Sequence, residues 1–232
     1  MQMQILESLN AARAAAKPVA LLTRLDSGEQ QLYFDDDENA NDSLSDEHLT
    51  LAREALRHDQ SKLVEEEQGS LFIQPFNTPL RMIVVGAVHI AQDLVTMASQ
   101  SGFEVSLVDP RQAFASEARF PGIRLINEWP DKVLESLRID QRSAIITLSH
   151  DPKLDDPALE IALKSNAFYI GSLGSRRTHA ARLQRLGEKG FSEEQQARIQ
   201  GPIGLDIGAR STAEIAISIM AQVIQMYRQS SE

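Results

Sequence analysis

The sequence predicts an α/β protein in which a doubly wound parallel sheet follows a small N-terminal α+β domain. Two observations predict this fold class. From about residue 79 onward, short apolar runs alternate with stretches of helical periodicity, as in strand–helix–strand units of a parallel sheet. Before that point, apolar runs are paired around turn signals, as in antiparallel hairpins. We therefore assign residues 1–78 to the small domain and residues 79–232 to the parallel-sheet domain.

The composition limits the classes of function. The chain has 232 residues, of which 42% are hydrophobic, and a formal net charge of −10. This acidic balance argues against nucleic-acid binding through the phosphate backbone. Cysteine is absent, which excludes disulfides and thiolate metal ligands. No apolar run reaches the roughly 18 residues of a membrane helix, and the first residues lack signal-peptide features. We expect a cytoplasmic protein without membrane contact.

The small domain is predicted to contain two helices and four strands. Its helices are expected over Ile5–Ala16 and from Asp46, as the cap, through Leu56. Its strands are expected at Val19–Arg24, Gln30–Phe34, Lys62–Glu67 and Ser70–Gln74. The acidic residues 35–47 do not follow the spacing of an EF-hand, so a solvated loop is expected there rather than a calcium site.

A strand and glycine turn begin the larger domain. The apolar run Met82–Val85 leads into Gly86, and a helix is expected from His89. Its first N–H groups and its dipole suit a phosphate. Asp109 ends the next strand about 20 residues later, where dinucleotide folds place a ribose-binding carboxylate.

That glycine fingerprint is incomplete. The pattern G-x-G-x-x-G/A is represented by Gly86, Val88 and Ala91. Because Val88 puts a branched side chain where a glycine normally lets the backbone approach a pyrophosphate, we predict weakened contact there. A turn of this type that binds nothing is the alternative.

Three further strands complete the expected sheet, and proline-containing turns start two of the intervening helices. The strands are expected at Ile123–Ile126, Ala144–Thr147 and Ala167–Ile170. Helices are expected from Pro130 and from Asp156-Pro157. In a strand order of 3-2-1-4-5, the loops after the first and fourth strands border the switch point, where such folds bind ligands.

Two more glycine-rich loops are candidate binding segments. Residues Gly171–Arg177 combine glycine turns, hydroxyls and two arginines at a helix start, with Ser175 as the expected cap, which favours an anion. An ordinary turn with solvated arginines is the alternative. In the loop Gly201–Ser211, Asp206 and Arg210 either pair with each other or face a ligand. Among the histidines, His150 beside Asp151 and Thr147 is the most notable, without the spacing of a metal site.

These segments together resemble a known family. The resembling stretches are Val84–Ala91, Val108–Arg111, Arg119–Pro121, Thr147–Asp151, Tyr169–Arg177 and Gly204–Ala209. They are similar to the Rossmann domain of the XdhC/CoxI family, the accessory proteins of molybdenum hydroxylases such as xanthine dehydrogenase. The resemblance covers about two-thirds of the chain, from about Leu80 to Tyr227.

The resemblance implies a cofactor chaperone with no turnover of its own. Proteins of this family bind molybdenum cofactor, a molybdopterin with a phosphate or dinucleotide tail, and help to deliver it to a xanthine-dehydrogenase-type hydroxylase. It also implies cofactor-synthesis or sulfurating enzymes as partners, and we expect a homodimer. The residues expected to bind cofactor are Gly86, Ala87, Val88, His89, Asp109, Arg111, Thr147, His150, Gly171, Ser172, Gly174, Ser175, Arg176, Arg177, Asp206 and Arg210.

This sequence departs from the family pattern in two places. The first turn of the family usually reads Gly-Ala-Gly-His, whereas Val88 replaces the second glycine here. Residues 1–78 lack the Gly-Ser-x-Pro-Arg and Gly-Gly-Cys segments usual in the N-terminal domain. Two other functions therefore stay open: an NAD(P)-dependent oxidoreductase, suggested by Gly86 and Asp109, and a non-binding module that docks on the hydroxylase.

Overall fold

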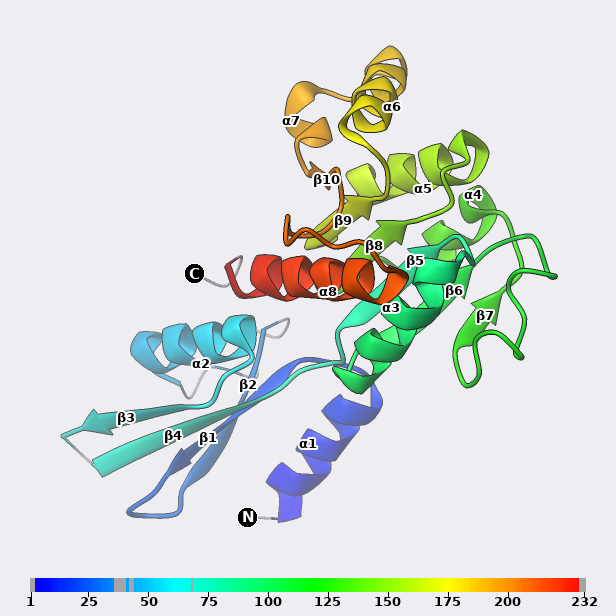
Figure 1. Cartoon of the computed structure of the whole chain (residues 1–232). Helices are drawn as coiled ribbons and strands as arrows, with labels where there is room; N and C mark the ends of the chain where they lie inside the picture. The colour runs from blue at the N-terminus through cyan, green and yellow to red at the C-terminus, as the bar shows by residue number, and fades with distance from the viewer. Residues whose placement is uncertain (1–2, 36–40, 42–43, 68, 230–232) are drawn as a thin grey trace. The chain divides into compact units, whose positions relative to one another are not determined.

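The computed structural model describes residues 3–35, 41, 44–67 and 69–229, and the chain divides into two compact units between Thr78 and Pro79 (Figure 1). We call them the N-terminal unit and the C-terminal unit. Most of the acidic loop expected at residues 35–47 lies outside the described residues. None of the helices in the described ranges is both long and apolar enough to cross a membrane.

In its described residues, the N-terminal unit is a four-stranded antiparallel sheet with two α-helices. Its sheet has the order β2-β1-β4-β3, and a core beneath α2 includes Ala20, Tyr33 and Ile73. The elements are α1 (Met3–Ala14), β1 (Val19–Arg24), β2 (Gln30–Phe34), α2 (Asp46–His58), β3 (Lys62–Glu66) and β4 (Gly69–Phe76). The cap of α2 is Ser45, whose hydroxyl accepts the His48 N–H, so the prediction of Asp46 as cap was wrong by one residue.

The C-terminal unit is a doubly wound α/β domain, as predicted. Its six parallel strands have the order β10-β9-β8-β5-β6-β7, which is the 3-2-1-4-5 order considered for the sequence, with one additional edge strand. The strands are β5 (Arg81–Val85), β6 (Glu104–Val108), β7 (Arg124–Ile126), β8 (Ser143–Thr147), β9 (Tyr169–Ser172) and β10 (Ile199–Gln200). The helices are α3 (His89–Gln100), α4 (Pro130–Val133), α5 (Pro152–Lys164), α6 (Arg176–Glu188), α7 (Glu193–Gln196) and α8 (Thr212–Gln229), with a 3-10 turn at Leu134–Leu137.

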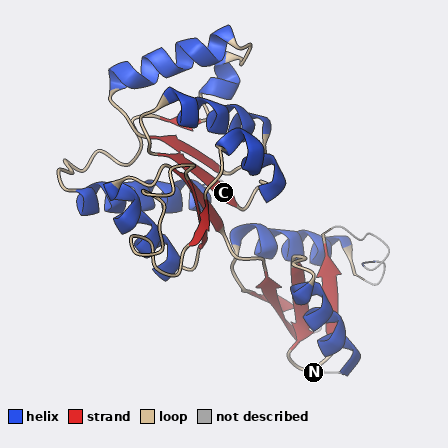
Figure 2. Ribbon diagram, turned by 90° about the vertical axis from the view of Figure 1, so that its right-hand side faces the viewer, coloured by secondary structure: helices blue, strands red, loops and turns tan. Residues whose placement is uncertain are grey.

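Alternate residues of the central strands enter separate cores on the two faces of the sheet, and helices cover both faces (Figure 2). Met82 and Val84 of β5 pack in the cluster that contains α3 and α8 residues. Ile83 and Val85 pack in the cluster that contains α5 residues. Burial on both faces explains why these strands are continuous apolar runs.

Prolines mark two helix starts in this unit. Pro130 occupies the first turn of α4, as predicted. Helix α5 begins at Pro152 with Asp151 as its cap, so the expected start at Asp156-Pro157 was about one turn late. Pro157 lies within the helix instead, where proline normally removes one backbone hydrogen bond.

Candidate functional site

The carboxyl edge of the parallel sheet brings the predicted loops together. Strand β5 pairs in parallel with both β6 and β8, and β8 pairs with β9. The chain therefore leaves all four strands at the same edge, and the topological switch lies between β5 and β8. The segments that follow these strands form the candidate site.

The turn after β5 requires its glycine. Gly86 has φ +107°, and a Cβ atom there would lie 2.8 Å from the backbone nitrogen of Ser149. The backbones of the β5 and β8 loops are thus in direct contact. A side chain at Gly86 would separate the two loops that border the switch point.

Asp109 is engaged within the protein. Its side chain is fully buried, accepts the Ala87 N–H at 2.8 Å, and forms a two-pronged ion pair with Arg111 at 2.8 and 2.6 Å. Burial opposes ionisation, but the bonds from Arg111 and from the backbone outweigh it and lower the pKa of Asp109. We predicted that the two residues line a ligand pocket rather than pair with each other. They do pair with each other, so that part of the prediction was wrong, and contact with a ligand stays a prediction. The carboxylate also holds the β5 turn through Ala87.

Arg119 supports the same turn, and it was not among the residues that we predicted to bind cofactor. Its guanidinium donates to the carbonyl oxygens of Ala87 at 2.9 Å and Phe114 at 2.7 Å. The motif Arg119–Pro121 was part of the family resemblance, but nothing in its spacing indicated which backbone groups the arginine holds. Asp109 and Arg119 together bind the loop after β6 to the turn after β5.

The start of α3 presents backbone donors without a side-chain cap. Val88 occupies the cap position with φ −84°, a conformation that does not require glycine, and no side chain among the described residues caps the helix there. The Val88 side chain packs on the core cluster beneath α3, while His89 is exposed. A ligand oxygen is therefore a suitable acceptor for the first N–H groups of α3.

The predicted hydroxyl ligands at the ends of β8 and β9 face each other inside the protein. Thr147 Oγ1 and Ser172 Oγ are 2.5 Å apart, and both side chains are fully buried. Gly171 is also buried, and a Cβ atom there would lie 2.6 Å from Ile203. These three positions join the strands and pack the sheet, and direct contact with a ligand by them stays a prediction.

The loop after β8 carries an exposed histidine in an unusual conformation. His150 has φ +60°, and its side chain is exposed. The neighbouring Ser149 hydroxyl donates to Asp155 of α5 at 2.6 Å and accepts the Asp151 N–H at 3.0 Å. These bonds hold the loop in place and leave His150 at the surface of the candidate site.

The turn into α6 is the most cationic part of the candidate site. Gly174 has φ +146°, and Ser175 caps α6 by accepting the Thr178 N–H at 3.1 Å, as predicted. Arg176 and Arg177 follow in the first helical turn, and both are exposed. The turn combines backbone N–H groups with two accessible guanidinium groups, which suits an anionic oxygen.

The loop before α8 is held by Glu214. That carboxylate accepts the backbone N–H groups of Arg210 at 2.7 Å and Ser211 at 2.9 Å, and these bonds lower the pKa of Glu214. Asp206 and the Arg210 side chain are exposed. The structure shows a helix cap here, and ligand contact by Asp206 and Arg210 stays a prediction.

A buried ionic pair lies behind the loops after β8 and β9. Asp155 of α5 and Arg182 of α6 are each 2% exposed, and their nearest charged atoms are 3.8 Å apart. We did not predict either residue. The sequence signal was the acidic Asp155 among the apolar residues of its helix, such as Leu159, and this does not identify the partner.

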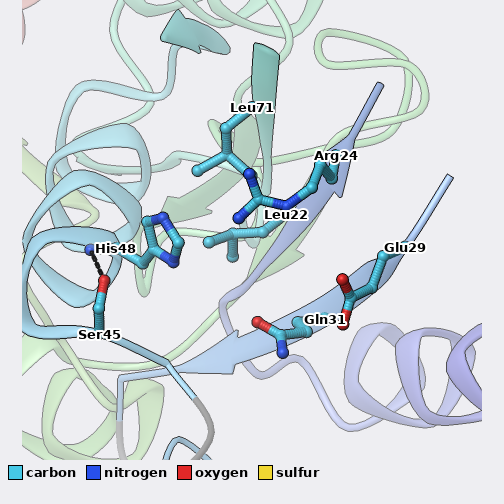
Figure 3. Close-up of a pocket in the computed structure, with 7 residues that line it drawn as sticks. All are labelled: Leu22, Arg24, Glu29, Gln31, Ser45, His48 and Leu71. Carbon is cyan, nitrogen blue, oxygen red and sulfur yellow. Dashed lines mark hydrogen bonds between the residues drawn. The ribbon is translucent and has the colours of Figure 1, made fainter. Parts of the chain in front are cut away.

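A polar pocket lies in the N-terminal unit. It has a volume of about 180 Å³, and Arg24 and His48 point into it from β1 and α2 (Figure 3). Both side chains bind Glu66, at 3.1 and 2.7 Å respectively. Within the described ranges, no cluster of three His, Cys, Asp or Glu side chains is arranged to hold a metal ion.

Comparison with known proteins agrees with the fold of the C-terminal unit. Residues 82–223 match the family described as the XdhC Rossmann domain. The chain is 32% identical over 148 residues to the molybdenum cofactor insertion chaperone PaoD of Escherichia coli K12. The aligned region covers 64% of this chain and 40% of that protein. It is 30% identical over 161 residues to a protein of Bacillus subtilis 168 named as a probable xanthine dehydrogenase subunit, which covers 69% and 47% respectively.

A solved structure resembles both units. The crystal structure of a xanthine dehydrogenase from Bacillus halodurans has a TM-score of 0.70 and 26% identity, and the match covers 97% of this chain and 64% of that one. The chain spans less than half the length of the two curated relatives. From the extent of the family match and the matching fold, the chain belongs to the XdhC family, and its C-terminal unit is the XdhC Rossmann domain.

Proposed function

We propose that this protein binds molybdenum cofactor at the carboxyl edge of the C-terminal unit and helps to deliver it to a xanthine-dehydrogenase-type hydroxylase. The observation that carries the proposal is the pair of helix starts at this edge. Helix α3 offers uncapped backbone donors, and α6 begins with the exposed Arg176 and Arg177. The relative named as a molybdenum cofactor insertion chaperone supports the choice of ligand.

The residues present fit the anionic part of such a cofactor. A pterin phosphate needs several donors and compensating positive charge, and backbone N–H groups plus guanidinium groups supply both. When bound, the cofactor would supply the molybdenum chemistry, and the role of this chain would be to hold and orient it. Because the chain has no cysteine, sulfur transfer to the metal would depend on a partner enzyme.

A nicotinamide dinucleotide fits this edge less well. The ribose of such a ligand would compete with Arg111 and the Ala87 N–H for Asp109, which is fully buried. Displacing Arg111 would break a charge-assisted pair at a buried carboxylate, which is costly. This geometry favours the pterin ligand over the NAD(P)-dependent oxidoreductase.

Cofactor content tests the proposal directly. The protein is purified from cells that make molybdenum cofactor, and the pterin released by oxidation is measured by fluorescence. We expect pterin in the wild-type protein, much less in the variant Arg176→Gln with Arg177→Gln, and none in protein from cells that cannot make the cofactor. Absence of pterin from the wild-type protein, together with tight NAD binding and hydride transfer, would favour the oxidoreductase instead.

A delivery assay separates a chaperone from a storage protein. Loaded protein is mixed with a cofactor-free hydroxylase of the xanthine dehydrogenase type, and the gain in hydroxylase activity is followed with time. We expect faster activation than with the same amount of free cofactor. Equal rates would remove the chaperone role even if the protein binds the cofactor.

A further inference from the structure

The buried pair Asp155–Arg182 connects the two loops that follow β8 and β9. Asp155 lies in the first turns of α5, directly after the β8 loop, and Arg182 lies in α6, directly after the β9 loop. Figure 1 shows α5 and α6 following these two strands in turn. Each member of the pair also makes a hydrogen bond to one of the loops, so the pair spans both.

Asp155 holds the β8 loop. Its Oδ1 atom accepts the Ser149 hydroxyl at 2.6 Å and the Ser149 N–H at 3.3 Å. Ser149 is the residue whose backbone contacts Gly86, so Asp155 also supports the contact between the β5 and β8 loops.

Arg182 holds the β9 loop. Its Nη2 atom donates to the carbonyl oxygen of Leu173 at 2.9 Å, immediately before Gly174 and the cap Ser175. The same Nη2 atom is 3.8 Å from Asp155 Oδ2. One nitrogen thus faces both the turn into α6 and the carboxylate that holds the neighbouring loop.

Several polar atoms of this pair lack the hydrogen-bond partners that a purely stabilising buried contact would have. Asp155 Oδ2 and the Nε and Nη1 atoms of Arg182 are buried without hydrogen-bond partners among the described residues. Burial raises the pKa of Asp155 and lowers the pKa of Arg182, so each group resists its charged form. Replacing such a pair by uncharged residues is often neutral or stabilising, so stability alone does not explain it.

We propose that Asp155 and Arg182 are positioning residues that couple the geometry of the β8 loop to that of the turn into α6. This inference rests on the proposed function, because these loops form part of the proposed cofactor site. Movement of the turn into α6 would shift Arg182 relative to Asp155. The resulting change in the electrostatic interaction at Asp155 would weaken its hydrogen bonds to Ser149. The two loops therefore adopt their binding geometry together.

Hydrogen exchange of the full chain, without ligand, tests the coupling. The substitution Arg182→Met removes the bond to Leu173 but leaves the Ser149 and Asp155 side chains in place. We expect exchange to accelerate by about threefold or more in residues 173–175 and also in residues 148–151, relative to amides of β5, which report global opening. If residues 148–151 of the variant exchange at the wild-type rate, the coupling is overturned.

A neighbouring ion pair provides a matched control. Arg185 binds Asp156 at 2.6 and 2.8 Å and joins the same two helices, but among the described residues neither side chain makes a hydrogen bond or ion pair to the β8 or β9 loop. The variant Arg185→Met with Asp156→Asn should leave exchange in both loops within about twofold of wild type. Equal acceleration in this control would mean that loosening α5 from α6 is sufficient, and it would also overturn the proposal.

The double variant Asp155→Asn with Arg182→Met links the coupling to the ligand. It removes both buried charges and should therefore fold with a melting temperature close to that of wild type. After purification from cofactor-producing cells, we expect it to carry at least about fivefold less pterin than wild type, because binding sites lose affinity when loop geometry is not preorganised. Unchanged pterin content would overturn the positioning role.

The two readouts separate failure of this inference from failure of the proposed function. If the wild-type protein carries no pterin, the proposed function fails, whereas the exchange experiment still decides whether the loops are coupled. If the wild-type protein carries pterin and the exchange near Ser149 does not respond to Arg182→Met, only the coupling fails.

Discussion

Asp109 contributes to the way in which the stability of the carboxyl edge depends on pH. Its pKa in the folded protein is lowered from the ordinary value of 3.8, so the ionised form stabilises the fold at pH values above the unfolded pKa. This contribution is lost as the pH falls through the lowered, folded pKa. The titration of Asp109 therefore changes the free energy of unfolding in the acidic range and does not change it near neutral pH.

Replacing Asp109 by asparagine should destabilise the protein most at neutral pH. We expect a loss of about 2 kcal/mol in the free energy of unfolding, less than for a wholly buried pair because Arg111 is partly exposed. The loss should shrink below about pH 4 as the wild-type carboxylate becomes protonated. Urea unfolding at several pH values measures both effects.

The control variant is Glu54→Gln, at the more exposed pair with Lys62. It should lower the free energy of unfolding by less than about 1 kcal/mol. A pH-independent loss for Asp109→Asn would contradict this account.

Gly86→Ala tests the contact between the β5 and β8 loops. The added Cβ atom would meet the Ser149 backbone at 2.8 Å in a left-handed conformation, so we expect a loss of at least about 3 kcal/mol. Gly102→Ala is the matched control, since Gly102 has φ +85° with nothing within 4 Å of its added Cβ. It should cost only about 1 kcal/mol of backbone strain. Equal losses, measured by denaturant unfolding, would show that backbone conformation rather than loop contact is decisive.

At the scale of elements, the N-terminus of α6 carries charges of the sign that is unfavourable to its own dipole. Arg176 and Arg177 lie in the first turn, where the helix dipole is positive, and the structure shows no acidic residue in that turn. The favourable Ser175 cap offsets part of this cost. Such an arrangement is more stable when an anion is bound than when the turn is empty.

The variant Arg176→Gln with Arg177→Gln tests separately whether these charges destabilise the empty helix start and whether they bind an anion. Without ligand, its free energy of unfolding should be unchanged or higher by up to about 1 kcal/mol, because two repulsive charges leave the helix start. Inorganic phosphate should raise the melting temperature of the wild-type protein but not of the variant. Sodium chloride at the same ionic strength controls for screening. Equal stabilisation of both proteins by phosphate would place the anion elsewhere.

At the scale of the whole molecule, the cores of the two units are separate. Among the described residues, the buried clusters of the N-terminal unit draw only on positions up to Phe76. Those of the C-terminal unit draw only on positions from Leu80 onward. Each unit thus buries its apolar side chains within itself, which is what independent folding requires.

A fragment of residues 79–232 should therefore fold alone. We expect it to unfold cooperatively and to keep the parallel-sheet and helix signals of the full chain in circular dichroism. Its melting temperature should lie within about 5 °C of the corresponding transition in the full chain, a shift equivalent to roughly 1–2 kcal/mol for a domain of this size. A fragment that lacks a cooperative transition would show that the N-terminal unit completes the fold.

The sequence alone determined the fold class, the principal strands and the family. Apolar runs and helical periodicity are local properties, because burial on one or two faces dictates which neighbouring positions are apolar. This is why Met82–Val85 and the Ser175 cap were predicted correctly, while the short strand Ile199–Gln200 and the start of α5 were not. The glycine turns also followed from local signals, since a turn restricts its own residues.

Only the tertiary structure decided how the polar residues are used. Asp109 is paired with Arg111, the hydroxyls of Thr147 and Ser172 bind each other, and Asp155 faces Arg182 across two helices. The strength of a charge or hydroxyl as a ligand depends on its burial and on the partners that distant segments bring to it. Those partners are set by the packing of strands and helices that are remote in sequence. The sequence shows which residues can bind an anion, whereas packing decides which of them, such as Arg176 and Arg177, are left free to face solvent.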